Sequence, residues 1–191
     1  MAGAATILAF SGSPSRRSLN DKVVRVAMQG AVEAGAGVRH VLLADYEMPV
    51  FNVDHEDDFG MHENARAFKA LMMEHRGFLI SAPENNGSVT AAFKNVIDWV
   101  SRTGDGNDGM AAFRGKYAAL LSASPGVFGG VRSLDHTRYM LARLGVWIIP
   151  QNFPVSGAEA MFDTEGRVID DRAADAMRAV GRALAETLKR V

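Results

Sequence analysis

Three short segments of the chain place hydroxyl, amide and glycine residues directly after apolar runs. They read SGSPSRRSLN at residues 11–20, SAPENNGS at 81–88 and SASPGVFGG at 122–130. The first offers neutral donors and positive charge through Ser13, Ser15, Ser18, Asn20 and either Arg16 or Arg17. Backbone N–H groups at a helix N-terminus also attract anions, so this segment favours a phosphate monoester. It has neither the Walker lysine nor the GxGxxG spacing, which excludes those two kinds of phosphate loop.

The second and third segments suit a flat heterocycle better than a phosphate. Glu84, Asn85 and Asn86 supply donors and acceptors for amide-like ring edges, while Pro83 stiffens the turn and Gly87 permits close approach of the backbone. The glycines of the third segment allow a similar approach. Taken singly, the first segment is equally typical of an ordinary turn with a helix cap, and the second could be a turn capped by Ser88 or Thr90. The third, judged alone, is more typical of a plain glycine-rich turn.

The elements around these segments alternate between strand and helix patterns. We expect strands at residues 6–10, 38–44, 78–80, 117–122 and 146–149, the last one stopped by Pro150. Between them, apolar residues recur at helical spacing, as in Val24, Ala27, Met28 and Ala31, and a final helix surrounds Met177 to Leu184. Residues 45–61 and 101–115 are predicted to be long polar loops, and residues 151–171 a connecting segment.

This alternation predicts an α/β protein with a parallel sheet covered by helices on both faces. Five strands favour a flavodoxin-like three-layer α/β/α fold with strand order 2-1-3-4-5. Ligands of such sheets bind at the carboxyl ends of the strands, beside strand 1. The three polar segments follow strands 1, 3 and 4, so they are expected to meet there.

Composition limits the remaining possibilities. The 191 residues suit a single domain, 1–191, with 48% hydrophobic residues and no cysteine, which excludes disulfides and thiolate chemistry. The net charge of −1 gives no reason to expect nucleic acid or an anionic membrane as a partner. We find no signal peptide and no membrane-spanning stretch, so a cytoplasmic location is expected.

The segments together resemble the flavodoxin-like NAD(P)H-dependent FMN reductases, which include quinone, azo and chromate reductases. The family pattern G-S-x-R-x-x-S-x-N is similar to residues 12–20, S-P-G-x-x-G-G is similar to residues 124–130, and the block KNVIDWVSR at residues 94–102 matches the family's KNAIDWxSR. Three positions depart from the pattern: Ser15 stands in place of the arginine, Asn85 in place of a tyrosine, and Thr90-Ala91 in place of Pro-Gly.

The resemblance implies FMN as cofactor, NADPH or NADH as reductant, and a quinone, flavin, azo compound or similar small molecule as electron acceptor. The implied FMN-binding residues are Gly12, Ser13, Ser15, Arg16, Ser18, Leu19, Asn20, Pro83, Glu84, Asn85, Asn86, Gly87, Ser124, Pro125 and Gly126. Arg16 is expected to replace the family arginine. No catalytic side chain and no metal site are expected, because the cofactor carries the chemistry.

The resemblance also implies a homodimer or homotetramer. Two alternatives remain: a flavin-binding electron carrier or redox-responsive regulator with little reductase activity, and a member that has lost flavin. Residues 104–109 match GxGxxG by letters but follow a predicted helix, so a loop is the better interpretation. Trp99 is at least as well explained by packing as by contact with a flavin.

Overall fold

A five-stranded parallel sheet forms the centre of the computed structural model, which describes residues 5–191. The strands are β1 (Thr6–Ser11), β2 (Gly37–Val41), β3 (Gly77–Ser81), β6 (Tyr117–Ala123) and β7 (Trp147–Val155). Their order is β2-β1-β3-β6-β7, and β1 pairs in register with both neighbours, Ile7 lying beside Val38 and Gly77. With β6 and β7 as the fourth and fifth strands, this confirms the predicted order.

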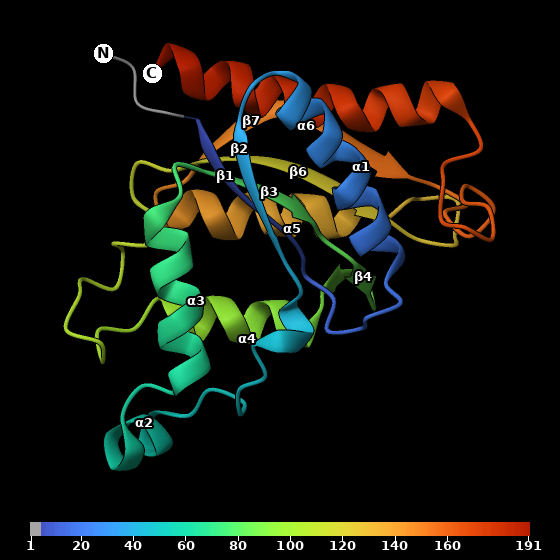
Figure 1. Cartoon of the computed structure of the whole chain (residues 1–191). Coiled ribbons are helices and arrows are strands. Elements are labelled where there is room, and N and C mark those ends of the chain that lie inside the picture. The colour runs from blue at the N-terminus through green and yellow to red at the C-terminus, as the bar shows by residue number, and fades with distance from the viewer. Residues whose placement is uncertain (1–4) are drawn as a thin grey trace.

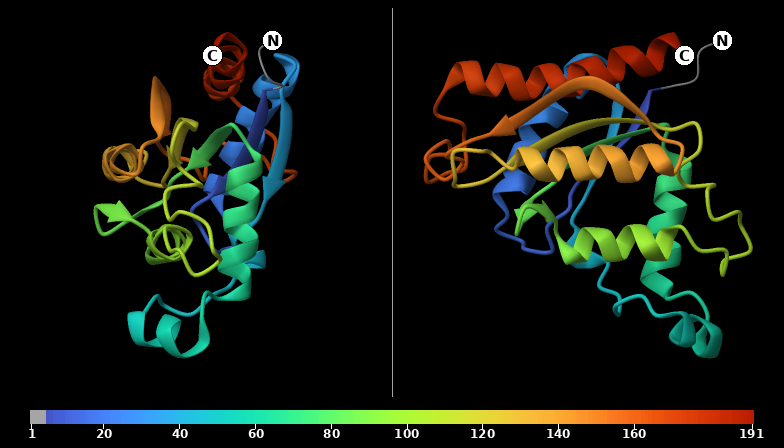
Figure 2. Two further views of the ribbon diagram at one scale, coloured as in Figure 1. Left: turned by 90° about the vertical axis from the view of Figure 1, so that its left-hand side faces the viewer. Right: turned by 180° about the vertical axis from the view of Figure 1, so that it is seen from behind.

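Helices cover both faces of the sheet (Figures 1 and 2). On one face lie α1 (Leu19–Glu33) and α6 (Asp171–Arg190); on the other lie α3 (Glu63–Glu74), α4 (Ala91–Val100) and α5 (Val131–Arg143). Alternate residues of one strand point to opposite faces, so Ile7 packs with α1 and α6 while Leu8 packs with α3 and α4. The strands are buried on both sides, which explains their nearly continuous apolar sequences.

The segment predicted as a loop at residues 45–61 contains helical turns. A short 3-10 helix, η1 (Leu43–Asp45), follows β2, and α2 (Val53–Phe59) projects from the body of the protein at the bottom of Figure 1. Asn52 caps α2 by accepting a hydrogen bond from the Asp54 N–H at 2.9 Å. Because α2 buries none of its residues, it has no apolar stripe from which the helix was predictable.

The fifth strand continues past Pro150, contrary to the prediction. Ile148 pairs with Ala118 and Asn152 with Leu120, so three residues of β7 lie opposite Ala119 alone, and Pro150 lies in this irregularity. β7 is an edge strand, where a residue without an N–H is tolerated at a bulge. The segment 151–171 is therefore a strand in its first part.

The N-terminal residues 1–4, on which part of the signal-peptide interpretation depends, lie outside the described range. Within residues 5–191, every helix is too short or too polar to cross a bilayer.

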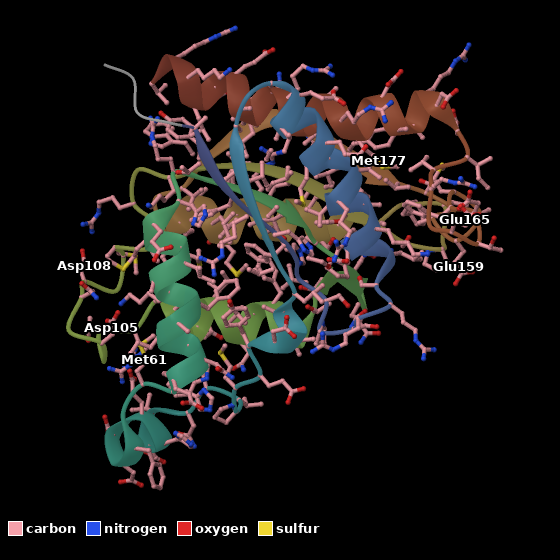
Figure 3. All side chains as sticks on the ribbon, in the orientation of Figure 1. Met61, Asp105, Asp108, Glu159, Glu165 and Met177 are labelled. Carbon is pink, nitrogen blue, oxygen red and sulfur yellow. The ribbon has the colours of Figure 1, made fainter. Side chains whose placement is uncertain are left out.

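A buried ion pair fixes the polar loop that follows α4. The Lys69 ammonium, which is inaccessible to solvent, donates to the Asp105 carboxylate at 2.7 Å and to the Arg102 carbonyl at 2.6 Å. Asp105 is labelled in Figure 3, on the loop beside α3. Burial alone would raise the pKa of Asp105, but hydrogen bonds from Lys69 and Asn107 outweigh it and lower the pKa to about 2.

This pair predicts a specific acid sensitivity. The folded-state pKa lies below the ordinary value of 3.8, so the stabilisation is fully present above about pH 4 and is lost as the pH falls towards 2. We expect Asp105→Asn to reduce the loss of unfolding free energy between pH 4 and pH 2.5 by about 1.4 kcal/mol. Lys69→Met should reduce it by part of that amount, because the hydrogen bonds from Asn107 to Asp105 remain. Urea unfolding at pH 4 and at pH 2.5 measures it. An unchanged slope in both variants would contradict the assignment.

Candidate functional site

The three polar segments meet at the carboxyl ends of β1, β3 and β6. The Gly12 N–H donates to the Ser81 carbonyl at 2.9 Å, and the Ala82 N–H donates to the Leu121 carbonyl at 2.8 Å. The Thr90 hydroxyl donates to the Gly12 carbonyl at 2.5 Å and accepts from the Phe93 N–H as the cap of α4. The predicted meeting of the loops is therefore confirmed by direct hydrogen bonds between them.

Asn20 is the central link between these loops. Its amide oxygen accepts from the Ser81 hydroxyl at 2.8 Å and from the Ala123 N–H at 2.9 Å, while its amide nitrogen donates to the Ala123 carbonyl at 2.9 Å. The residue is 4% exposed. Its side chain joins the start of α1 to the ends of β3 and β6. It therefore fixes the positions of the loops that follow these strands.

A series of hydroxyl-to-backbone bonds shapes the loop after β1. The N–H groups of Ser13, Ser15 and Arg17 donate to the hydroxyls of Ser11, Ser13 and Ser15, each two residues earlier. A serine hydroxyl that accepts from the backbone still has its own proton to donate. The loop thus orients neutral donors, as a bound phosphate requires. Ser18 caps α1, and Leu19 is the first residue of that helix.

Two further features define this loop. A Cβ atom at Gly12 would lie 3.0 Å from the Phe93 side chain, so a larger residue there would be crowded against α4. The Arg16 guanidinium pairs with the Asp45 carboxylate of η1 at 2.5 Å, and both side chains are at least half exposed. Because exposed ion pairs contribute at most about 1 kcal/mol, a doubly charged phosphate competes well for this arginine.

The loop after β3 forms a small hairpin of β4 (Glu84–Asn85) and β5 (Ser88–Val89). Its turn residues Asn86 and Gly87 have φ values of +51° and +77°. Positive φ at both positions is the requirement of the tight turn that Asn-Gly favours. That dipeptide was the available sequence signal for the hairpin. Pro83 lies half-buried before β4, and Asn85 is exposed opposite Ser88.

The Glu84 carboxylate fastens this hairpin to α5. It accepts from the Arg132 Nε at 2.7 Å, from Nη2 at 2.6 Å and from the Arg132 backbone N–H at 3.1 Å. The Glu84 side chain is 9% exposed. Arg132 was not among the predicted site residues, because no spacing rule joins positions so far apart in the sequence. Glu84 therefore holds the predicted ring-binding segment in place.

We expect Arg132→Ala to release the hairpin and to weaken FMN binding about tenfold, the equivalent of one lost charged hydrogen bond. Titration of the apo-protein with FMN, followed by flavin fluorescence, measures the change. Arg138→Ala, farther along the same helix, is the control. Equal affinity of the two variants for FMN would show that the hairpin does not depend on this ion pair.

The loop after β6 turns through two glycines. Gly129 and Gly130 have φ values of +58° and +83°, and a Cβ atom on Gly130 would lie 2.9 Å from the Ser122 Cβ. The Ser122 hydroxyl donates to the Gly129 carbonyl at 2.7 Å. This hydrogen bond fixes the buried end of the loop. Its predicted site residues Ser124, Pro125 and Gly126 are half-buried or exposed at the surface. This arrangement leaves backbone accessible for a flat ring.

Fourteen of the fifteen predicted residues fall into two groups, and the fifteenth, Leu19, begins α1. Ser13 is half-buried and Ser15 and Arg16 are exposed, so their donor groups are accessible, and the residues of the other two loops that reach the surface border the same edge. Gly12, Ser18, Asn20 and Glu84 shape and support that edge. The donor set fits a phosphate joined to a flat, amide-edged ring, which is the chemistry of FMN. Trp99 is fully buried beneath the segment after η1, in agreement with its interpretation as a packing residue.

Comparison with known proteins agrees with this geometry. Residues 5–160 match the family model described as NADPH-dependent FMN reductase. The chain is 33% identical over 189 residues to an NAD(P)H-dependent FMN reductase of Pseudomonas aeruginosa, covering 97% of this chain and 96% of that one. It is also 33% identical over 169 residues to a probable NADPH:quinone oxidoreductase of Oryza sativa subsp. japonica, covering 86% and 79%.

A solved structure has the same fold. FerB, a flavoenzyme NAD(P)H:(acceptor) oxidoreductase from Paracoccus denitrificans, superposes with a TM-score of 0.79 at 24% identity, covering 98% of both chains. On the family match and the extent of these similarities, the chain belongs to the NADPH-dependent FMN reductase family.

Proposed function

We propose that this protein passes electrons from NAD(P)H through bound FMN to a quinone or a similar small acceptor. The observation that carries the proposal is the meeting of three loops that present hydroxyl donors, a guanidinium and accessible backbone at one sheet edge, in a chain of this family. Overall, a hydride from NAD(P)H and one proton from water convert the two carbonyls of a quinone into two hydroxyls.

The protein's own part in this reaction is to bind and to orient. FMN, when bound, supplies the capacity to accept a hydride and to pass on electrons. The hydroxyls of Ser13 and Ser15 and the Arg16 guanidinium would hold its phosphate. The hairpin at residues 84–89 and the loop at 124–130 would position its ring, and no acid or base from the chain is required.

We also propose that the protein is a homodimer or homotetramer. Apolar side chains beside the site support this: Val127, Phe128 and Tyr139 are 81%, 61% and 71% exposed. Neighbouring exposed side chains of this kind, such as Val127 and Phe128, are typical of a surface that a second protein covers. Light scattering of the purified protein measures the assembly.

The visible spectrum tests the proposed function. After addition of FMN and desalting, we expect the protein to retain flavin absorbance that is bleached by NADPH or NADH in the absence of oxygen, and to turn over with a quinone. Retained flavin without bleaching would favour an electron carrier or regulator instead. A protein that retains no flavin would overturn the cofactor assignment.

A further inference from the structure

A cavity of about 650 Å³ lies at the end of the sheet opposite to the FMN loops. It is formed where the chain enters β6 and β7, whereas the proposed FMN site lies at the carboxyl ends of the strands. Its wall comes from the turn before β6, the last two turns of α5 and the first residues of β7. None of the residues assigned to FMN lines it, so a molecule bound here would be a separate ligand.

An exposed tryptophan forms one wall of this cavity. Trp147 is the first residue of β7 and is 65% exposed, while its neighbour Val146 is buried, as alternation along a strand requires. The Trp147 backbone N–H donates to the Lys116 carbonyl at 2.8 Å, so the base of the side chain is fixed. The other tryptophan of the chain, Trp99, is fully buried. A large aromatic surface left in water beside a cavity is typical of a site that another molecule covers.

Two arginines supply the charge of this cavity, and its described lining contains no acidic residue. Arg138, on α5, is half-buried, and within residues 5–191 its guanidinium has no ion-pair partner. Arg114 pairs with Asp108 at 2.9 Å, but the two side chains are 70% and 56% exposed. An ion pair this exposed contributes little, so a bound anion can compete for Arg114. Because a guanidinium fits the two oxygens of a carboxylate, the cavity favours an anion of this kind.

The backbone at the end of α5 leaves room for such an anion. Gly115 and Gly145 have φ values of +75° and +90°, and the Gly115 N–H donates to the Gly145 carbonyl at 3.3 Å. The carbonyls at a helix C-terminus ordinarily repel anions. Here the Ala142 carbonyl accepts from the Gly145 N–H at 3.0 Å, and the Leu141 carbonyl accepts from the Val146 N–H at 3.1 Å. Backbone donors therefore offset part of this negative charge.

We propose that this cavity binds a flat aromatic carboxylate, whose ring stacks on Trp147 and whose carboxylate pairs with Arg138 and Arg114. Small-molecule sites combine apolar surface with a few polar groups in this way, and the volume is within their usual range. A neutral aromatic compound lacks the ion pair, and a small inorganic anion lacks the ring. The inference goes beyond the proposed function and does not rest on it, because the two sites share no residue.

The indole N–H signals of the FMN-loaded protein test the proposal by NMR. The chain contains two tryptophans, so two such signals are expected, and Trp147→Phe assigns them. Titration with 2-naphthoate should shift the Trp147 signal saturably and leave the Trp99 signal in place. We expect 2-naphthamide, which has the same ring but no charge, to bind at least about tenfold more weakly.

Calorimetric titration of variants with 2-naphthoate measures the contribution of each side chain. Arg138→Ala should weaken binding about tenfold, and Arg138→Lys, which keeps the charge without the planar fork, should recover part of the loss. Trp147→Ala should also weaken binding about tenfold, because the stacking surface is lost. Arg143→Ala is the matched control, because Arg143 lies on the same helix but lines a different groove.

The outcomes are independent of those that test the proposed function. Equal binding of 2-naphthoate and 2-naphthamide, or equal affinity of the Arg138→Ala and Arg143→Ala variants, would overturn the anion site. A Trp147 signal that responds to dilution of the protein but not to 2-naphthoate would show that a second copy covers this surface, and the proposal would fail. If the protein retains no FMN, the proposed function fails, and the same titration of the apo-protein still tests the cavity.

Discussion

Replacing Asn20 by alanine is expected to lower the affinity for FMN at least about tenfold and the unfolding free energy by about 3 kcal/mol. The substitution removes three buried hydrogen bonds and leaves the Ser81 hydroxyl and the Ala123 backbone groups without this partner. Unpaired buried polar groups cost more than the net value of the bonds they made. The ends of β3 and β6 should then separate from α1, and the FMN-binding loops with them.

Titration with FMN and urea unfolding of the same preparation measure both effects. Asn20→Asp retains an acceptor oxygen but loses the donor to the Ala123 carbonyl, so its effect should be intermediate. Asn64→Ala is the control, because that amide bonds to the Glu47 carbonyl at the surface. If the Asn20 and Asn64 variants behave alike, the loops do not depend on this link.

The second large effect is on stability and comes from the contact between α1 and α6. A Cβ atom at Gly181 would lie 1.9 Å from the Ala27 carbonyl oxygen, and one at Gly30 would lie 2.0 Å from the Arg178 carbonyl oxygen. Glycine to alanine inside a helix ordinarily stabilises by about 1 kcal/mol. Here we expect Gly181→Ala to destabilise by roughly 3 kcal/mol, because two helix backbones must move apart.

Urea unfolding measures this difference, and Gly37→Ala is the matched control. A Cβ atom at Gly37 would have its nearest neighbour at 3.9 Å, an ordinary contact, so this variant should remain within about 0.5 kcal/mol of the parent protein. A neutral or stabilising Gly181→Ala would mean that the helices slide to accommodate the methyl group without loss.

The sequence was most informative where burial dictates residue type. Strands buried on both faces must be apolar, so the runs at residues 6–10 and 78–80 located the strands and, through them, the edge where the loops meet. α2 was not predicted because it buries no residue and so has no apolar stripe. The extension of β7 was not predicted because a proline such as Pro150 ordinarily ends a strand.

Contacts between distant positions were the other omission. The fold brings together two ion pairs, Arg16 with Asp45 and Glu84 with Arg132. No local sequence pattern predicts pairs between residues so far apart in the chain. Asn20 was predicted to be a cofactor-binding residue, and its bonds to Ser81 and Ala123 could not be predicted because they depend on how three strand ends come together. Propensity and spacing indicate which groups are present, whereas tertiary packing decides which of them face a ligand.

The contact between α1 and α6 also bears on how the protein matures. The loop that would hold the phosphate leads into α1, and both leave the ribosome before the residues of α6. The buried face of α1 is covered by α6, which is formed by residues 171–190, close to the end of the chain. Until those residues emerge, α1 lacks the surface against which it packs. We therefore expect the cofactor to bind only after α6 has emerged from the ribosome, and a ribosome-bound nascent chain that lacks α6 should remain without flavin.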